Sequence, residues 1–162
     1  MPIYKEDMVF TRRREELEAR PSSARERFRR GILIAGVATT VFGVLHHTDH
    51  VIRGNHSGWP FQEAVTPFTF SLLIYALILP GLYLTARGRM ITGYHLFVAL
   101  VGLALVFAVH FLGAGREAPI QDIYEVYGSP MAGLFALGVL AALFISLAAL
   151  AITAFRARRA GS

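Results

Sequence analysis

The chain contains no cysteine among its 162 residues. This absence excludes disulfide bonds, thiolate metal sites, iron–sulfur clusters and haem attached through thioether bonds. It leaves open any site that is built from histidine, aspartate and glutamate side chains. The sequence also lacks a phosphate-binding glycine loop and a dinucleotide-binding motif, so nothing in it indicates a nucleotide-dependent enzyme.

Charged residues are scarce, at 17% of the chain, and four long segments contain almost none of them. A transmembrane helix needs about 20 mostly apolar residues, and each of these segments has roughly that length. The fold class predicted from this pattern is all-α. We expect a polytopic membrane protein in which a four-transmembrane-helix bundle covers residues 31–155, with helices at about 31–53, 66–86, 90–113 and 130–155.

Basic residues collect on one side of this arrangement. Of the 16 lysines and arginines, only Arg53 and Arg116 fall in the loops on the other side. The positive-inside rule therefore predicts that both chain ends are cytoplasmic. We expect the basic segments 1–30 and 156–162 to contact the anionic headgroups of the lipid bilayer. No stacking aromatic residues interleave with the arginines, so nucleic-acid binding is not expected.

Proline and hydroxyl residues mark the expected helix ends. The sequence Pro21-Ser22-Ser23 is expected to break the N-terminal segment into a short cytoplasmic helix and a second helix that enters the membrane. Thr66-Pro67 and Ser129-Pro130 each place a hydroxyl N-cap before a proline in the first helical position. Pro80 is expected to kink the second membrane helix.

Five of the six histidines lie at the end of the bundle that is predicted to face away from the cytoplasm. At about 100° per residue, His46, Asp49 and His50 share one helical face with glycine and threonine, and branched aliphatic residues occupy the opposite face. Small residues allow close helix packing in a bilayer, so the histidine face is predicted to point into the bundle. His110 lies at the same depth on the third helix, while His95 is expected to form a hydrogen bond in the bundle interior.

This arrangement predicts a metal site, because two histidines four residues apart on a helix can chelate one ion. The predicted ligands are His46, His50 and His110, with Asp49 and His47 as further candidates and His56, Asp122 and Glu125 as more distant ones. Nitrogen and oxygen ligands without sulfur suit Zn, Cu, Fe or Mn. The sequence does not distinguish among a metal-dependent enzyme, a sensor and a protein that handles metal.

Several alternatives remain open. Haem b could bind between His46 or His50 and His110, with Arg53 or Arg116 near its propionates, for electron transfer. The polar residues could instead form a buried structural network, or a pH sensor or proton relay. The protein could also be a non-catalytic structural or accessory subunit of a larger membrane complex, or a homo-oligomer. Trp59 is expected in the aromatic belt at the membrane surface, or alternatively in a lid over the histidines.

The segment from His46 to Pro60, together with Thr66-Pro67-Phe68-Thr69, has a distinctive pattern of histidine, glycine and aromatic residues. It resembles a family of small, uncharacterised prokaryotic four-helix membrane proteins. The resemblance covers the first two membrane helices, under half of the chain. It implies the same membrane topology and a prokaryotic cytoplasmic membrane as the location, and it implies no particular activity.

Overall fold

The described part of the chain is helical. The computed structural model describes residues 4–112 and 120–161, with side chains from 24 to 112 and from 123 to 161. Within these ranges the chain forms helices and turns, without a strand. The elements in chain order are α1 (Tyr4–Arg53), the 3-10 helix η1 (Gly54–Ser57), α2 (Pro67–Ser71), α3 (Leu73–Ala86), α4 (Thr92–Phe111), α5 (Ile120–Tyr127) and α6 (Pro130–Arg159).

Four helical segments in the described ranges are long and apolar enough to cross a membrane. They are Ala24–Ser57, Pro67–Ala86, Thr92–Phe111 and Pro130–Arg159. The predicted all-α fold with four membrane-spanning helices is therefore confirmed. The last three spans begin within two residues of their expected positions, and α6 continues past Phe155 to Arg159.

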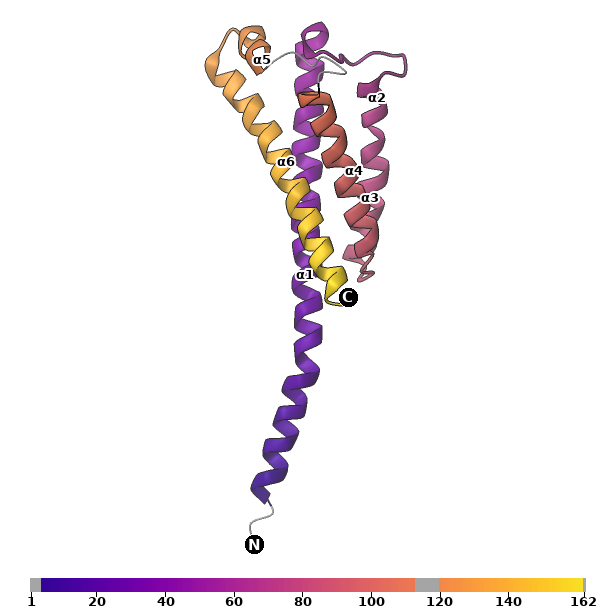
Figure 1. Ribbon diagram of the computed structural model, residues 1–162, viewed down its shortest axis with the longest axis vertical. Helices are drawn as coiled ribbons and strands as arrows, with labels where there is room; N and C mark the ends of the chain where they lie inside the picture. The colour runs from indigo at the N-terminus through magenta and orange to yellow at the C-terminus, as the bar shows by residue number, and fades with distance from the viewer. Residues whose placement is uncertain (1–3, 113–119, 162) are drawn as a thin grey trace.

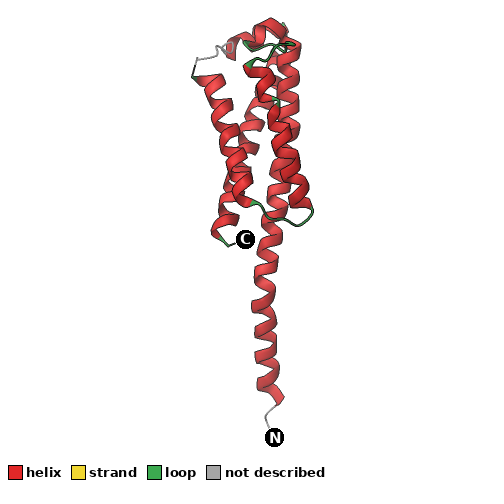
Figure 2. Cartoon of the chain, turned by 90° about the vertical axis from the view of Figure 1, so that its right-hand side faces the viewer, coloured by secondary structure: helices red, strands yellow, loops and turns green. Residues whose placement is uncertain are grey.

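Consecutive spans run in opposite directions (Figure 1), and the contacts between the helices close the four spans into a ring. α1 packs against α3 and α6, and α4 packs against the same two helices. η1, α2 and α5 lie together at one end of the bundle, whereas α6 ends at the opposite end. The N-terminal part of α1 continues alone beyond that opposite end (Figure 2). The side of the membrane on which each end lies stays a prediction.

α1 is one continuous helix from Tyr4 to Arg53. The break that we expected at Pro21-Ser22-Ser23 is wrong, because the helix passes through these residues. A proline removes one backbone donor and crowds the carbonyl four residues earlier, but the turns on either side can still carry a helix through it. The second span is interrupted at Leu72, between α2 and α3, and α3 continues through Pro80.

Two helix starts follow the predicted capping pattern. The Thr66 side chain accepts a hydrogen bond from the backbone N–H of Thr69 at 3.2 Å, and the Thr69 hydroxyl accepts one from the backbone N–H of Thr66 at 2.6 Å. The Ser129 hydroxyl accepts from the backbone N–H of Ala132 at 3.5 Å. Each cap is followed by a proline, which has no backbone donor to leave unsatisfied. These caps fix where the second and fourth spans begin.

The two faces of α1 lie as the sequence predicts. Its branched aliphatic face is exposed to the surroundings of the bundle, with Val37, Val44 and Ile52 at 53%, 49% and 65% exposure. Its polar face is buried in the bundle, with His46 at 6% and His50 at 3% exposure. In a bilayer the exposed face meets lipid, so no polar group of the histidine face has to be solvated by hydrocarbon.

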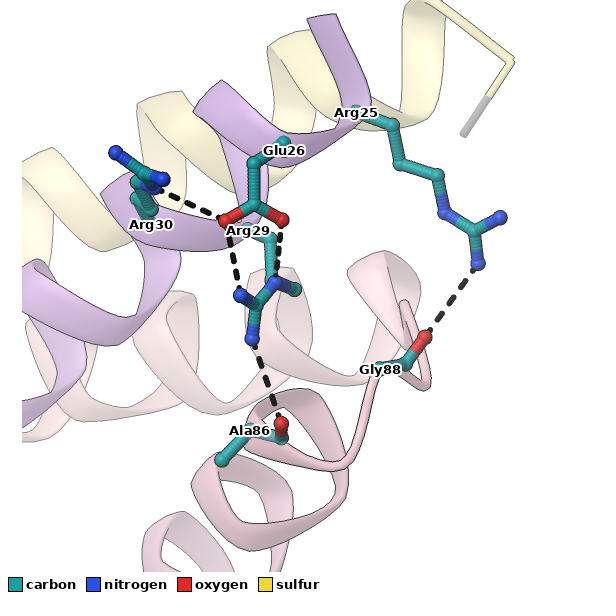
Figure 3. Close-up of polar contacts among 6 residues, drawn as sticks. All are labelled: Arg25, Glu26, Arg29, Arg30, Ala86 and Gly88. Atoms are coloured by element: carbon teal, nitrogen blue, oxygen red, sulfur yellow. Dashed lines mark hydrogen bonds and ion pairs between the residues drawn. The ribbon is translucent and has the colours of Figure 1, made fainter. Parts of the chain in front are cut away.

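At the end of the bundle opposite the histidines, arginines of α1 form hydrogen bonds to the end of α3 and the turn that follows it (Figure 3). Arg29 forms an ion pair with Glu26 at 2.7 Å and also donates to the carbonyl of Ala86 at 3.4 Å. Arg25 donates to the carbonyl of Gly88 at 3.5 Å. These carbonyls end α3 and begin the turn to α4, where a cationic group is favoured by the helix dipole. The contacts join α1 to the α3–α4 turn.

Candidate metal centre

Three histidines from two helices meet at the end of the bundle that carries α2 and α5. Each of His46, His50 and His110 has a ring nitrogen within 4.8 Å of a ring nitrogen of the other two. The ring centroids of His46 and His50 are 4.8 Å apart, and those of His46 and His110 are 5.0 Å apart. The structure therefore brings together the three residues that the sequence singles out first as ligands.

Helix geometry explains this meeting. His46 and His50 are four residues apart on α1, so their side chains stack on one face one turn apart. His110 lies in the last turn of α4, which reaches the same depth in the bundle. The cluster is shielded, since His46 and His50 are buried and His110 is half-buried.

The hydrogen bond of His110 indicates which of its ring nitrogens carries the lone pair in the neutral ring. Its Nδ1 lies 2.8 Å from the carbonyl oxygen of Val106. A carbonyl oxygen can only accept, so Nδ1 carries the proton in the neutral ring and Nε2 carries the lone pair. Metal-binding histidines commonly donate their other nitrogen to a backbone carbonyl in this way. His110 is thus already in the tautomer that a metal ion requires.

The three-nitrogen geometry is close to that of a metal site. Zinc binds imidazole nitrogen at about 2.0 Å, which in a tetrahedral site separates two ligand atoms by roughly 3.3 Å. The three nitrogens lie within 4.8 Å of one another, so metal binding would draw them together by up to about 1.5 Å. Three histidines fill three of four tetrahedral positions and leave the fourth for water or another ligand.

Asp49 lies beside this cluster but is engaged elsewhere. Its Oδ2 accepts from Nε and Nη2 of Arg53 at 2.9 and 2.7 Å, and its Oδ1 accepts from the hydroxyl of Tyr127 at 2.5 Å. Burial and the adjacent Asp49 carboxylate raise the pKa of Tyr127 to about 12. The sequence proposed Asp49 as a further ligand; in the structure its carboxylate forms an ion pair with Arg53 within α1, and its hydrogen bond from Tyr127 connects α5 to α1. This ion pair fits the alternative hypothesis that the polar residues form a buried structural network.

His47 points away from the three histidines toward the second span. Its Nε2 lies 2.8 Å from the hydroxyl of Ser71, and its Nδ1 lies 2.6 Å from the hydroxyl of Tyr75. Its ring also packs edge-on against Phe68. Ser71 and Tyr75 were not among the predicted site residues, although their spacing of four residues near the start of the second span was a signal for a polar face.

The more distant candidates do not join the cluster in the described residues. His56 in η1 and Glu125 in α5 are exposed. Asp122 belongs to α5, and its side chain lies outside the described ones. His95 lies toward the other end of the bundle, 1% exposed, with its Nε2 2.7 Å from the Thr85 hydroxyl, as expected for an interior hydrogen bonder.

A cavity of about 90 Å³ adjoins the three histidines. It extends between the spans toward the middle of the bundle, and the half-buried Trp59 contributes to its wall at the histidine end. The arrangement can therefore hold one ion with nitrogen ligands next to an enclosed space. Neither a protein-family profile, nor a characterised protein, nor a solved structure matches this chain.

Proposed function

We propose that this membrane protein binds one divalent transition metal ion through His46, His50 and His110. The observation that carries the proposal is the convergence of three imidazole nitrogens within 4.8 Å of one another, from two helices. The hydrogen bond from Nδ1 of His110 to the carbonyl of Val106 supports it further. Zn, Cu, Fe and Mn all accept such ligands, and the site is on the end of the bundle that the charge distribution predicts to face away from the cytoplasm.

Burial of these histidines supports a role beyond packing. Polar side chains at membrane depth are costly, and they are usually retained where they bind or transfer something. A cation bound by the three imidazoles would be shielded from the apolar surrounding by their nitrogen ligands. Exposed clusters of acidic side chains gain less from a bound cation, because water already solvates their charges.

The haem b alternative has less support. A haem whose iron is bound by two imidazoles needs enough room between them for the whole porphyrin ring. The rings of His46 and His110 are 5.0 Å apart, and the adjoining cavity of about 90 Å³ is far smaller than the macrocycle. The geometry therefore favours an ion.

Membership in a larger complex is a second candidate, and one observation favours it. The N-terminal part of α1 extends alone past the end of the bundle (Figures 1 and 2). An isolated helix is only marginally stable in water, so a partner or a lipid surface would stabilise it. Mild extraction followed by native mass spectrometry tests this candidate function. If it is right, a partner protein or a second copy of the chain stays bound and is detected by its mass.

Metal analysis tests the main proposal. The detergent-purified protein is saturated with Zn²⁺, desalted and analysed by plasma mass spectrometry. We expect about one ion per chain in the wild type and in His56→Ala, and less than about a tenth of that in His46→Ala/His50→Ala. His56→Ala serves as the matched control, because it removes an exposed imidazole and leaves the three clustered histidines unchanged. Equal zinc content in the wild type and the double variant would refute the proposal.

A further inference from the structure

The cavity beside the histidines is built from all four spans. Thr39 of α1, Ile78 of α3, Val106 of α4 and Leu143 of α6 contribute to its wall. The histidines lie at one end of it, and beyond them the wall is largely aliphatic or glycine. A molecule in this cavity would therefore meet the metal at one end and mostly apolar side chains elsewhere, with the side chains of Thr39, Thr40, Ser71 and Tyr75 as polar exceptions.

The size of the cavity limits what it can hold. A cavity of roughly 150 Å³ accommodates a benzene molecule. The cavity here is about 90 Å³ and so suits a molecule of only a few heavy atoms. Lipid tails, quinone rings and peptides are excluded by this volume.

The position of the wall indicates where such a molecule would enter. Val101 of α4 lines the cavity and is also 43% exposed on the outer surface of the bundle. The side chain of Val101 thus extends from the cavity wall to the bundle surface that faces hydrocarbon in a bilayer. Charged molecules do not dissolve there, whereas small apolar ones do.

We propose that the cavity admits a small, neutral, apolar molecule from the bilayer to the fourth coordination position of the metal held by His46, His50 and His110. This proposal rests on the metal site proposed above and names the class of ligand that reaches it. Three protein ligands with one open position are the arrangement of metal sites that bind or activate a substrate, and closed four-ligand sites are structural. The aliphatic wall then selects for ligands without charge.

Nitric oxide is a suitable probe, because it is neutral, diatomic and binds directly to transition metals. The chain has no cysteine, so thiol nitrosation cannot mimic binding at the metal. The protein is loaded with Co²⁺, whose visible absorption reports the number and type of its ligands. Nitric oxide is then titrated under anaerobic conditions, and the change of the cobalt absorption is recorded.

Two substitutions on α6 separate the cavity from general packing. Leu143→Phe enlarges a buried side chain in the cavity wall, whereas Leu134→Phe makes the same change at a position that is 51% exposed. Thr39→Leu is a second cavity-filling variant on another helix, for use if Leu143→Phe does not fold. All of these residues are distinct from the three proposed ligands.

We expect wild type and Leu134→Phe to show the cobalt absorption and to change it on adding nitric oxide. Leu143→Phe and Thr39→Leu should retain the cobalt absorption but need at least about tenfold more nitric oxide for the half-maximal change. If wild type shows the cobalt absorption without a response to nitric oxide, or if both cavity-filling variants respond as wild type does, the ligand proposal is overturned and the metal site stands. If wild type shows no cobalt absorption, the metal site is overturned and the ligand proposal with it.

Discussion

The hydroxyl of Tyr127 donates a 2.5 Å hydrogen bond to Oδ1 of Asp49, joining α5 to a residue 78 positions earlier in α1. The other carboxylate oxygen of Asp49 pairs with Arg53, which is only 2% exposed. A buried carboxylate with both oxygens satisfied holds its neighbours in fixed positions, because breaking any one contact leaves a desolvated charge. Since Asp49 immediately precedes His50, this network also fixes the end of α1 that carries the candidate ligands.

Tyr127→Phe should destabilise this end of the bundle. The substitution keeps the ring and removes one hydrogen bond to a charged group, a change that costs about 1.5–3 kcal/mol. The measurement is thermal unfolding in detergent, followed by the fluorescence of Trp59, which is the single tryptophan of the chain. Tyr124→Phe in the same helix is the control, since its hydroxyl makes no hydrogen bond to any described residue. Equal losses in the two variants would show that the Asp49 contact contributes nothing.

The same contact predicts a stability change at high pH. The pKa of Tyr127 is raised to about 12, first by burial and then by its hydrogen bond to Asp49. An unfolded tyrosine has a pKa of about 10, so the folded protein favours the protonated hydroxyl. The protonated Tyr127 hydroxyl therefore contributes its full stabilisation of the folded protein below about pH 10. This stabilisation is lost as the pH rises toward 12. Unfolding temperatures of wild type and Tyr127→Phe should therefore converge between about pH 10 and 12, and curves that stay parallel throughout would contradict this prediction.

His47→Ala should separate stability from metal binding. Its ring nitrogens lie within hydrogen-bonding distance of Ser71 and Tyr75, and its ring packs on Phe68. Removing the ring leaves two hydroxyls of the second span without this partner, which costs about 1–3 kcal/mol. The three ligand nitrogens are untouched, so zinc content per folded chain should equal that of wild type. A loss of zinc comparable to that of His46→Ala/His50→Ala would place His47 in the site.

The histidine cluster could be predicted because helix geometry alone determines most of it. Four-residue spacing places His46 and His50 on one face, and the rise per residue places His110 at their depth. The glycines and threonines of that face indicated which way it points. These steps use only the spacing within each helix and the kinds of residue on its faces.

The environment of Asp49 and His47 depends on such long-range packing and was not predicted. Asp49 shares the histidine face, so spacing alone made it a candidate ligand. Arg53, four residues later, was a competing signal, because an i, i+4 acid–base pair on a helix is a common ion pair. The contact from Tyr127 required knowing that the segment between the third and fourth spans contains α5. The spacing of Ile120, Ile123, Tyr124 and Tyr127 is amphipathic and was the available signal for that helix.

The orientation of the bundle in the membrane is open to a direct test, because the chain has no native cysteine. Asn55 in η1 and Ala160 after α6 are both exposed and lie at opposite ends of the bundle. Asn55→Cys and Ala160→Cys therefore each place one thiol at a known end without competing labels. The charge distribution predicts that the Asn55 end faces away from the cytoplasm.

A membrane-impermeant maleimide is added to intact cells and, in parallel, to permeabilised cells. We expect Asn55→Cys to be labelled in both samples and Ala160→Cys only after permeabilisation. Label on Ala160→Cys alone in intact cells would reverse the orientation and place the histidine end in the cytoplasm. The cluster itself would remain intact in that case, because its geometry does not depend on the direction of insertion, but the metal would then be drawn from the cytoplasmic pool.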